Sequence, residues 1–145
     1  MACPYFIPTE KFVSGGWPHP SRLPLGTGYR GLCTAACDQQ IVPSDQELRE
    51  FCNLGYATRC PRLPNPRRFD AVRFSVARDR DHRVQICCVL ETAHRPAAYR
   101  MLEYDSAVGR WGITHPDQRI QAMAACYLES YLARRQQQHA ASAEA

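Results

Sequence analysis

Cysteines concentrate in the part of the chain that is least suited to regular structure. The first 66 residues hold five of the eight cysteines, nine of the eleven prolines and six of the eight glycines. Prolines and glycines interrupt helices and strands, so this half should consist mainly of loops. Loops bury little apolar surface and need a staple, such as a disulfide or a bound metal. The cysteines therefore constrain the fold more than any other feature.

The redox compartment decides which staple is possible. The chain begins Met1-Ala-Cys-Pro, without the basic stretch and apolar run of a signal peptide. No segment approaches the ~20 apolar residues that span a bilayer. We therefore expect a cytoplasmic protein with no membrane partner. Disulfides are rare in a reducing compartment, so metal binding and plain core packing remain as the explanations for the thiols.

The hydrophobic pattern after the cysteine-rich half predicts an antiparallel sheet. Apolar and polar residues alternate over 72–76 and again over 84–90, and residues 79–82 between them supply a turn. Shorter strands are expected over 99–104 and 110–114. The sheet should therefore have three to four strands.

Helical spacing predicts one long helix at the C-terminal end. Pro116 suits its first turn, and it should lie across one face of the sheet. Seven apolar positions define its buried side: Ile120, Met123, Ala124, Tyr127, Leu128, Tyr131 and Leu132. In the first half, Ser44 and Glu47 form a capping-box pattern for a helix that runs to Asn53, with Gly55 as its stop. A two-turn helix is expected over 32–38.

These patterns together predict a single α+β domain over residues 1–135. Its first half, 1–66, would be loop-rich and stapled by metal, and its second half, 67–135, would hold the sheet and the long helix. The polar, alanine-rich tail over 136–145 should fray. A domain of this length buries roughly 70% of the surface of its unfolded chain, which is enough for a real core.

The spacing of the N-terminal cysteines favours a [4Fe-4S] cluster over zinc. Structural zinc usually relies on C-x2-C or C-x4-C knuckles, whereas three residues separate Cys33 from Cys37 and seven separate Cys52 from Cys60. Thiolates from well-separated loops can approach a cube from different directions. Cys3 and Cys60 also precede prolines, as the last cysteine of a ferredoxin run does. Scattered packing thiols are the alternative.

Several short motifs in the first half add to this reading: Pro24-Leu-Gly, Gly31-Leu-Cys33, Cys52-Asn-Leu-Gly-Tyr-Ala57 and Cys60-Pro-Arg62. With them the chain resembles an uncharacterised family of small bacterial proteins that are regarded as iron-sulfur proteins. The resemblance implies Cys3, Cys33, Cys52 and Cys60 as the metal and cofactor ligands, and it names no activity. Cys37 is the reserve ligand: if it faced the metal together with Cys33 from one helix, Cys3 would be the thiol displaced.

Other residues offer weaker candidates for chemistry. Cys87 and Cys88 are neighbours on a strand and point to opposite faces, so with Cys126 they are expected to be packing residues. His19 is the one histidine that could support the metal centre, although an exposed loop position is the simpler expectation. Three acidic residues on predicted strands should be solvated at the surface: Glu91, Glu103 and Asp105.

Arginine supplies nearly all of the positive charge. The net charge is +4, and Lys11 is the single lysine beside 17 arginines. Genome composition can account for this bias, while a patch that recognises phosphate or carboxylate is the alternative. The densest group is Arg59, Arg62, Arg67 and Arg68. So modest a net charge gives little reason to expect a nucleic-acid partner.

We therefore expect a small iron-sulfur protein that carries electrons, or responds to redox state, for a partner protein. A non-catalytic interaction module stabilised by zinc or by a cluster is the first alternative. An enzyme in which three thiolates leave one iron of the cluster open to substrate is the second.

Overall fold

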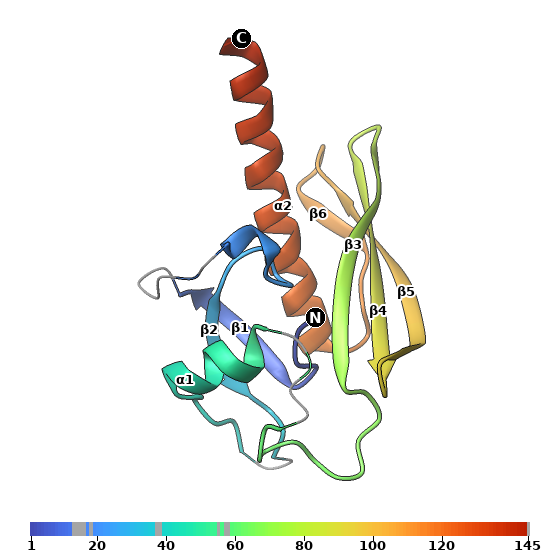
Figure 1. Ribbon diagram of the computed structural model, residues 1–145. Coiled ribbons are helices and arrows are strands. Elements are labelled where there is room, and N and C mark those ends of the chain that lie inside the picture. The colour runs from blue at the N-terminus through green and yellow to red at the C-terminus, as the bar shows by residue number, and fades with distance from the viewer. Residues whose placement is uncertain (13–16, 18, 37–38, 55, 57–58, 145) are drawn as a thin grey trace.

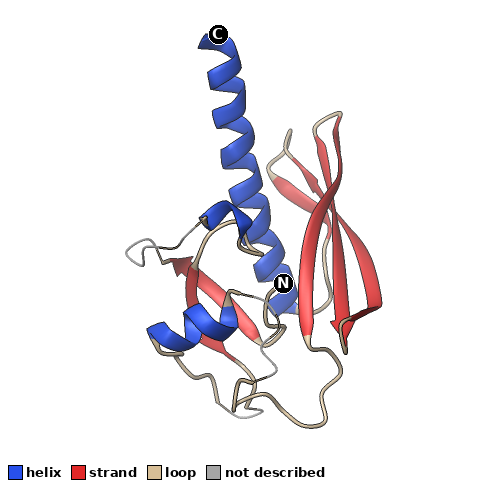
Figure 2. Cartoon of the chain, in the orientation of Figure 1, coloured by secondary structure: helices blue, strands red, loops and turns tan. Residues whose placement is uncertain are grey.

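Two antiparallel sheets and one long helix are the main elements of the described part of the chain (Figure 2). The computed structural model describes residues 1–12, 17, 19–36, 39–54, 56 and 59–144. The small sheet pairs β1 (Phe6–Lys11) with β2 (Tyr29–Cys33). The large sheet has the order β3 (Ala71–Arg80), β4 (Arg83–Thr92), β5 (Arg95–Asp105) and β6 (Arg110–Ile113). The predicted α+β class with an antiparallel sheet is confirmed.

The predicted alternation sets the inner face of the large sheet. Val72 on β3 lies opposite Leu90 on β4, and both are buried. The turn between these strands is shorter than the predicted 79–82, because the ladder continues to Arg80. Only Asp81 and His82 form the turn, with φ angles of 56° and 63°. Positive φ at both central residues is typical of the two-residue hairpins that match strand twist.

Strand β5 begins four residues before its predicted start at 99. Ala93 and His94 form another turn with positive φ, and the strand continues directly from Arg95. Its residues as far as Met101 are exposed, so no alternation between buried and exposed positions marks this part. A pattern of hydrophobicity cannot reveal a strand that lies on the surface on both sides.

The long helix α2 (Gln118–Glu144) lies between the large sheet and the N-terminal half (Figure 1). It begins two residues after Pro116, where the Asp117 side chain accepts a hydrogen bond from the Arg119 amide at 2.9 Å. All seven predicted apolar positions belong to the core or pack against it. The helix also continues through the tail expected to fray, whose glutamines and alanines favour helix. No helix in the described residues is apolar enough over a sufficient length to cross a membrane.

Strand β1 lies in the half for which the many prolines and glycines predict mainly loops. Pro8 lies opposite Gly31, and the register shifts between Pro8 and Glu10, so the proline sits beside a bulge where the ladder tolerates it. Gly31 is required here: a Cβ at this position would collide with the carbonyl oxygen of Ile7. The two strands therefore approach more closely than a side chain would allow.

The predicted helix over 44–53 is confirmed, whereas the predicted helix over 32–38 is wrong. The capping box joins Ser44 and Glu47 through bonds of 3.2 and 3.0 Å at the start of α1 (Asp45–Glu47). The chain then continues as the π-type turn η3 (Leu48–Cys52). Residues 32 and 33 instead belong to β2, because they pair with β1. Gly55, Cys37 and Asp38 lie outside the described residues.

One hydrophobic core connects the two halves. Phe6, Leu25 and Leu48 from the first half belong to the same buried cluster as Ile86 and Met123. A 3-10 helix, η2 (Pro20–Arg22), leads into the segment that carries Leu25. The Ser130 hydroxyl on α2 donates a hydrogen bond to the Leu25 carbonyl at 2.9 Å, which fixes the N-terminal half against the helix.

Gly31→Ala should lower the free energy of unfolding by about 1–3 kcal/mol, the usual cost of forcing an extra group into a packed site. Urea denaturation of both variants provides the measurement. Gly112→Ala on β6 is the matched control, because the nearest atoms to its added Cβ lie 4.0 Å away. That control should change the free energy by no more than about 0.5 kcal/mol. Equal stability of the two variants would contradict the close approach at Gly31.

Candidate functional site

Cys3 is held in place by the segment around it. The amide of Ala2 donates to the Val72 carbonyl at 2.7 Å, and the Val72 amide donates back to Ala2 at 2.9 Å. The next amide, that of Cys3, donates to the Cys52 carbonyl at 3.4 Å. Cys3 itself is only 7% exposed. The N-terminal thiol is therefore fixed against β3 and beside the end of η3.

Cys33 is the last residue of β2. It lies opposite Phe6 in the small sheet and forms an isolated bridge with Ile41. Its amide donates to the Ile41 carbonyl at 2.7 Å, and its carbonyl accepts from the Ile41 amide at 3.0 Å. The backbone of this half-buried cysteine is thus held on both sides.

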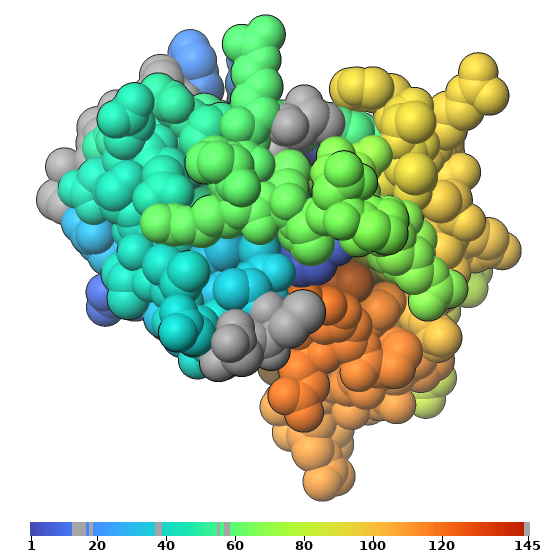
Figure 3. Space-filling model, turned by 90° about the horizontal axis from the view of Figure 1, so that it is seen from below, coloured from blue at the N-terminus to red at the C-terminus, as the bar shows by residue number. Residues whose placement is uncertain are grey.

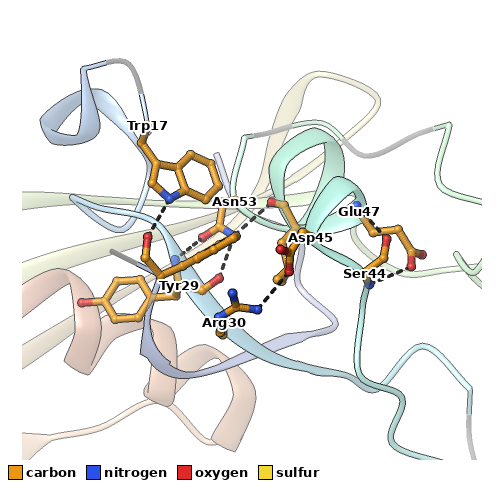
Figure 4. Close-up of polar contacts among 9 residues, drawn as sticks. Trp17, Tyr29, Arg30, Ser44, Asp45, Glu47 and Asn53 are labelled. Atoms are coloured by element: carbon orange, nitrogen blue, oxygen red, sulfur yellow. Dashed lines mark hydrogen bonds and ion pairs between the residues drawn. The ribbon is translucent and has the colours of Figure 1, made fainter. Parts of the chain in front are cut away.

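Cys52 ends η3, and its neighbour Asn53 fixes that end (Figure 4). The Asn53 side chain accepts from the Tyr29 amide and donates to the Tyr29 carbonyl, each at 3.0 Å. It also donates to the Leu48 carbonyl at 3.0 Å. Asn53 is 1% exposed, so these bonds satisfy a polar group that would be costly to bury alone. They join η3 to β2 and so bring Cys52 toward the strand that carries Cys33.

Cys60 begins a turn that is linked to α1, the helix that precedes η3. The Leu63 amide donates to the Cys60 carbonyl at 3.2 Å. Arg62 within the turn forms an ion pair of 2.8 Å with Glu47, the capping-box residue of α1. This pair is partly shielded from solvent and links the Cys60 turn to the helix that ends at Cys52.

The charges of other cysteines act on the two buried thiols, Cys3 and Cys52. Burial is the main cause that raises the pKa of Cys3, to about 11, and the charges of Cys33 and Cys60 raise it further. The pKa of Cys52 is also raised, mainly by burial and further by the charges of Cys3, Cys33 and Cys60. A like charge disfavours ionisation of a thiol only when it lies nearby. Cys33 and Cys60 therefore lie near enough to Cys3 and Cys52 for their charges to act on both, and the role of the four thiols as ligands stays a prediction.

The other described cysteines stand apart from this group. Burial raises the pKa of Cys88 to about 12, and the one thiol that contributes there is its neighbour Cys87. Burial also raises the pKa of Cys126 to about 11, without a contribution from another cysteine. Cys88 is buried while Cys87 is half-buried, as expected for opposite faces of a strand. The reserve ligand Cys37 lies outside the described residues.

In the described residues, no group of three or more His, Cys, Asp or Glu side chains is close enough to hold a single metal ion. The metal staple itself remains a prediction.

Arg119, on the first turn of α2, adds a positive charge beside this group. Its guanidinium lies 5.2 Å from the centre of the Tyr5 ring and donates to the Thr34 hydroxyl at 3.1 Å. The charge of Arg119 lowers the pKa of Cys3, and so does a hydrogen bond from the Tyr5 backbone. Nothing in the local sequence marks Arg119, because it meets the cysteines only through tertiary packing.

Other residues considered from the sequence lie outside this centre. His19 is exposed, as expected, in a left-handed conformation before η2. The expectation that Glu91 is solvated is wrong, because it is 6% exposed. It forms an ion pair of 2.8 Å with Arg73 and accepts from the Tyr56 hydroxyl at 3.0 Å. Burial of this carboxylate is thus compensated by partners that the sequence did not reveal.

Three members of the dense arginine group make separate local contacts. Arg62 pairs with Glu47, and Arg67 pairs with Asp70 at 2.6 Å. Arg68 lies over the Phe69 ring at 5.1 Å from its centre. Neighbouring arginines in the sequence therefore serve different local contacts.

No protein-family profile, curated protein sequence or solved structure matches this chain. The resemblance to a family with this cysteine pattern stays a prediction, and the functional argument depends on the geometry of the site.

In metal-free protein, iodoacetamide at pH 8 should modify Cys33 and Cys60 before Cys3 and Cys52. Cys3 is buried, and raising the pKa of its thiol from 9.0 to about 11 leaves about 100-fold fewer thiolates at that pH. Peptide mass mapping over time measures the order of modification. All eight cysteines of urea-unfolded protein should react at similar rates. Early modification of Cys3 in the folded protein would contradict its burial.

Proposed function

We propose that Cys3, Cys33, Cys52 and Cys60 bind one [4Fe-4S] cluster, and that the protein carries electrons or responds to redox state for a partner protein. The observation that carries the proposal is the set of contacts between the segments of these cysteines: Cys3 with Cys52, Asn53 with β2, and Arg62 in the Cys60 turn with Glu47. They come from the N-terminal segment, the end of β2, the end of η3 and a Cys-Pro turn. A [4Fe-4S] cube requires thiolates that approach it from four directions, and four separate segments can supply them.

The cost of ionising these thiols explains why a metal would matter to the fold. Burial and like charge both raise the pKa of Cys3 and Cys52, so without a counter-charge these thiols stay protonated. A bound metal centre stabilises thiolates, and its binding energy then contributes to folding. The metal would then cross-link the loop-rich half, which by its composition buries little apolar surface.

The residues around the centre suit one-electron transfer. A bound [4Fe-4S] cluster accepts and releases one electron, at a potential set by charge, hydrogen bonds and solvent exposure. Cys3 and Cys52 are buried, whereas Cys33 and Cys60 are half-buried. The chain would therefore shield one side of the centre and leave the side of Cys60, next to exposed Arg59, nearer to a partner protein. Arg119 would supply a fixed positive charge on the inner side.

Protein purified without oxygen should be brown and contain about four iron and four sulfide per chain. Cys52→Ala and Cys60→Ala should each lose the iron and sulfide, because three thiolates hold the cluster less tightly. Cys126→Ala is the matched control and should keep both. Elemental analysis and visible absorbance provide the measurement.

Three results would contradict parts of this proposal. Colourless protein with one zinc per chain would replace the cluster by zinc and favour an interaction module. Full iron content in Cys60→Ala would remove that residue from the ligand set. If Cys3→Ala keeps its iron and Cys37→Ala loses it, then Cys37 is the fourth ligand.

Arg119→Gln should lower the reduction potential of the iron-loaded protein, because it removes a positive charge that favours the more negative, reduced state. Arg135→Gln is the control, since Arg135 pairs with Asp79 at 2.9 Å and does not contribute to the pKa of either buried thiol of the site. Redox titration followed by visible absorbance measures both. A potential unchanged in Arg119→Gln would show that this charge does not reach the centre.

A further inference from the structure

A cleft of about 670 Å³ lies where α2 begins, beside the ends of β4 and β5. Figure 3 views this end of the molecule, where the segment near residue 68 (green), the sheet (yellow) and the start of α2 (orange) meet. Its lining includes Arg68, Phe69, Arg100, His115, Arg119 and Ile120. Three segments far apart in the sequence thus enclose one space.

The cleft carries more positive charge than its surroundings neutralise. Asp117 is the one acidic residue in its lining, and it is already paired with Arg119 at 2.9 Å. Neither Arg68 nor Arg100 forms an ion pair with any described carboxylate. Two guanidinium groups are therefore free to bind an anion, and such groups match the geometry of carboxylate and phosphate oxygens.

His115 adds a hydrogen-bond donor inside the cleft. The residue is 9% exposed, and its Nδ1 atom accepts a hydrogen bond from the Asp117 amide at 3.0 Å. In the neutral ring the proton must then lie on Nε2, which forms no hydrogen bond with a described residue. The start of the 27-residue helix α2 lies beside it and contributes the positive end of the helix dipole.

Part of the lining is apolar. Phe69, Leu90, Ala98 and Ile120 contribute to it, and Leu90 and Ile120 are also core residues. Clefts of this volume accommodate small organic molecules, with apolar walls for the body and a few polar groups for orientation. A cleft for a simple inorganic ion would need neither this volume nor these walls.

We infer that this cleft binds a small organic anion whose carboxylate or phosphate group lies between Arg68 and Arg100, with its apolar body against Phe69 and Ile120. The Nε2 hydrogen of His115 donates to the same anionic group. This inference does not depend on the cluster, because none of the four cysteines lines the cleft. Arg119 belongs to both sites, since it lines the cleft and its charge acts on Cys3.

Calorimetry with benzoate, phenyl phosphate and inorganic phosphate tests the inference on the full chain as purified. One of the two organic anions should bind more tightly than inorganic phosphate, and which one does so identifies the anionic group. Arg68→Gln combined with Arg100→Gln should weaken that binding by at least about 10-fold, as expected for the loss of charge-assisted hydrogen bonds. Both side chains are exposed, so the double variant should fold.

Arg95→Gln is the matched control, because Arg95 is an exposed arginine on the same strand as Arg100 and lies outside the cleft. It should bind the organic anion as the unmodified protein does. Equal losses in Arg95→Gln and in the double variant would indicate general charge attraction and overturn the inference. Binding of neither organic anion at about 10 mM, where ΔG° is only about −2.7 kcal/mol, would also overturn it.

A second readout does not require a variant. Burial lowers the pKa of His115, and the charge of Arg100 lowers it further. An anion bound beside the ring favours the imidazolium, so saturating phenyl phosphate or benzoate should raise the pKa of His115 in an NMR titration. The pKa of exposed His19 should not move. An unchanged pKa of His115 under conditions where calorimetry shows binding would place the anion elsewhere and overturn the inference.

Discussion

The backbone bridge between Ala2 and Val72 is the constraint on which the arrangement of the two halves depends. Its two hydrogen bonds add the N-terminal segment to the edge of the large sheet. Ala2 and Val72 are both fully buried, so the bridge forms where water cannot compete for the backbone groups. From this point the chain enters β1, and the small sheet lies against the opposite side of α2 (Figure 1). One core can then serve both halves.

The same bridge fixes the backbone beside Cys3. The first residues of a domain are poorly ordered unless such contacts hold them. Here the Cys3 amide donates a hydrogen bond to the Cys52 carbonyl, and the preceding residue, Ala2, forms the bridge to Val72. Asn53 then fixes Cys52 relative to β2, and the pair of Arg62 with Glu47 fixes the turn of Cys60. Each thiol is positioned by backbone or polar contacts of its own segment, which is the support that a cysteine centre needs from its surroundings.

Positive charge is distributed by tertiary structure and not by the order of arginines along the chain. Arg62 and Arg67 lie in the densest group of the sequence, yet each is committed to a nearby carboxylate. The cleft instead combines Arg68, Arg100 and Arg119, which come from a loop, from β5 and from α2. Arg119 lines the cleft, and its charge also acts on Cys3.

Local patterns in the sequence were sufficient to predict the helices and strands that bury one face and expose the other. Alternation over 72–76 and 84–90, the spacing from Ile120 to Leu132 and the capping box at Ser44 each predicted an element that the structure contains. These signals survive because the period of burial matches the period of the element. Composition pointed to five N-terminal cysteines, and the family resemblance implied four of them as ligands, which stays a prediction.

Tertiary structure alone decided what depends on contacts between distant residues. Strand β1 contains a proline, and it forms because Gly31 lets β2 approach, while the helix expected over 32–38 gave way to that pairing. The burial of Glu91 with Arg73, the charge of Arg119 beside Cys3 and the cleft beside α2 likewise join separate segments. Such contacts stabilise the protein only after distant segments have come together, so no short stretch of sequence reveals them. The sequence by itself determined which residues are candidates for a site, and packing determined which segments lie beside one another.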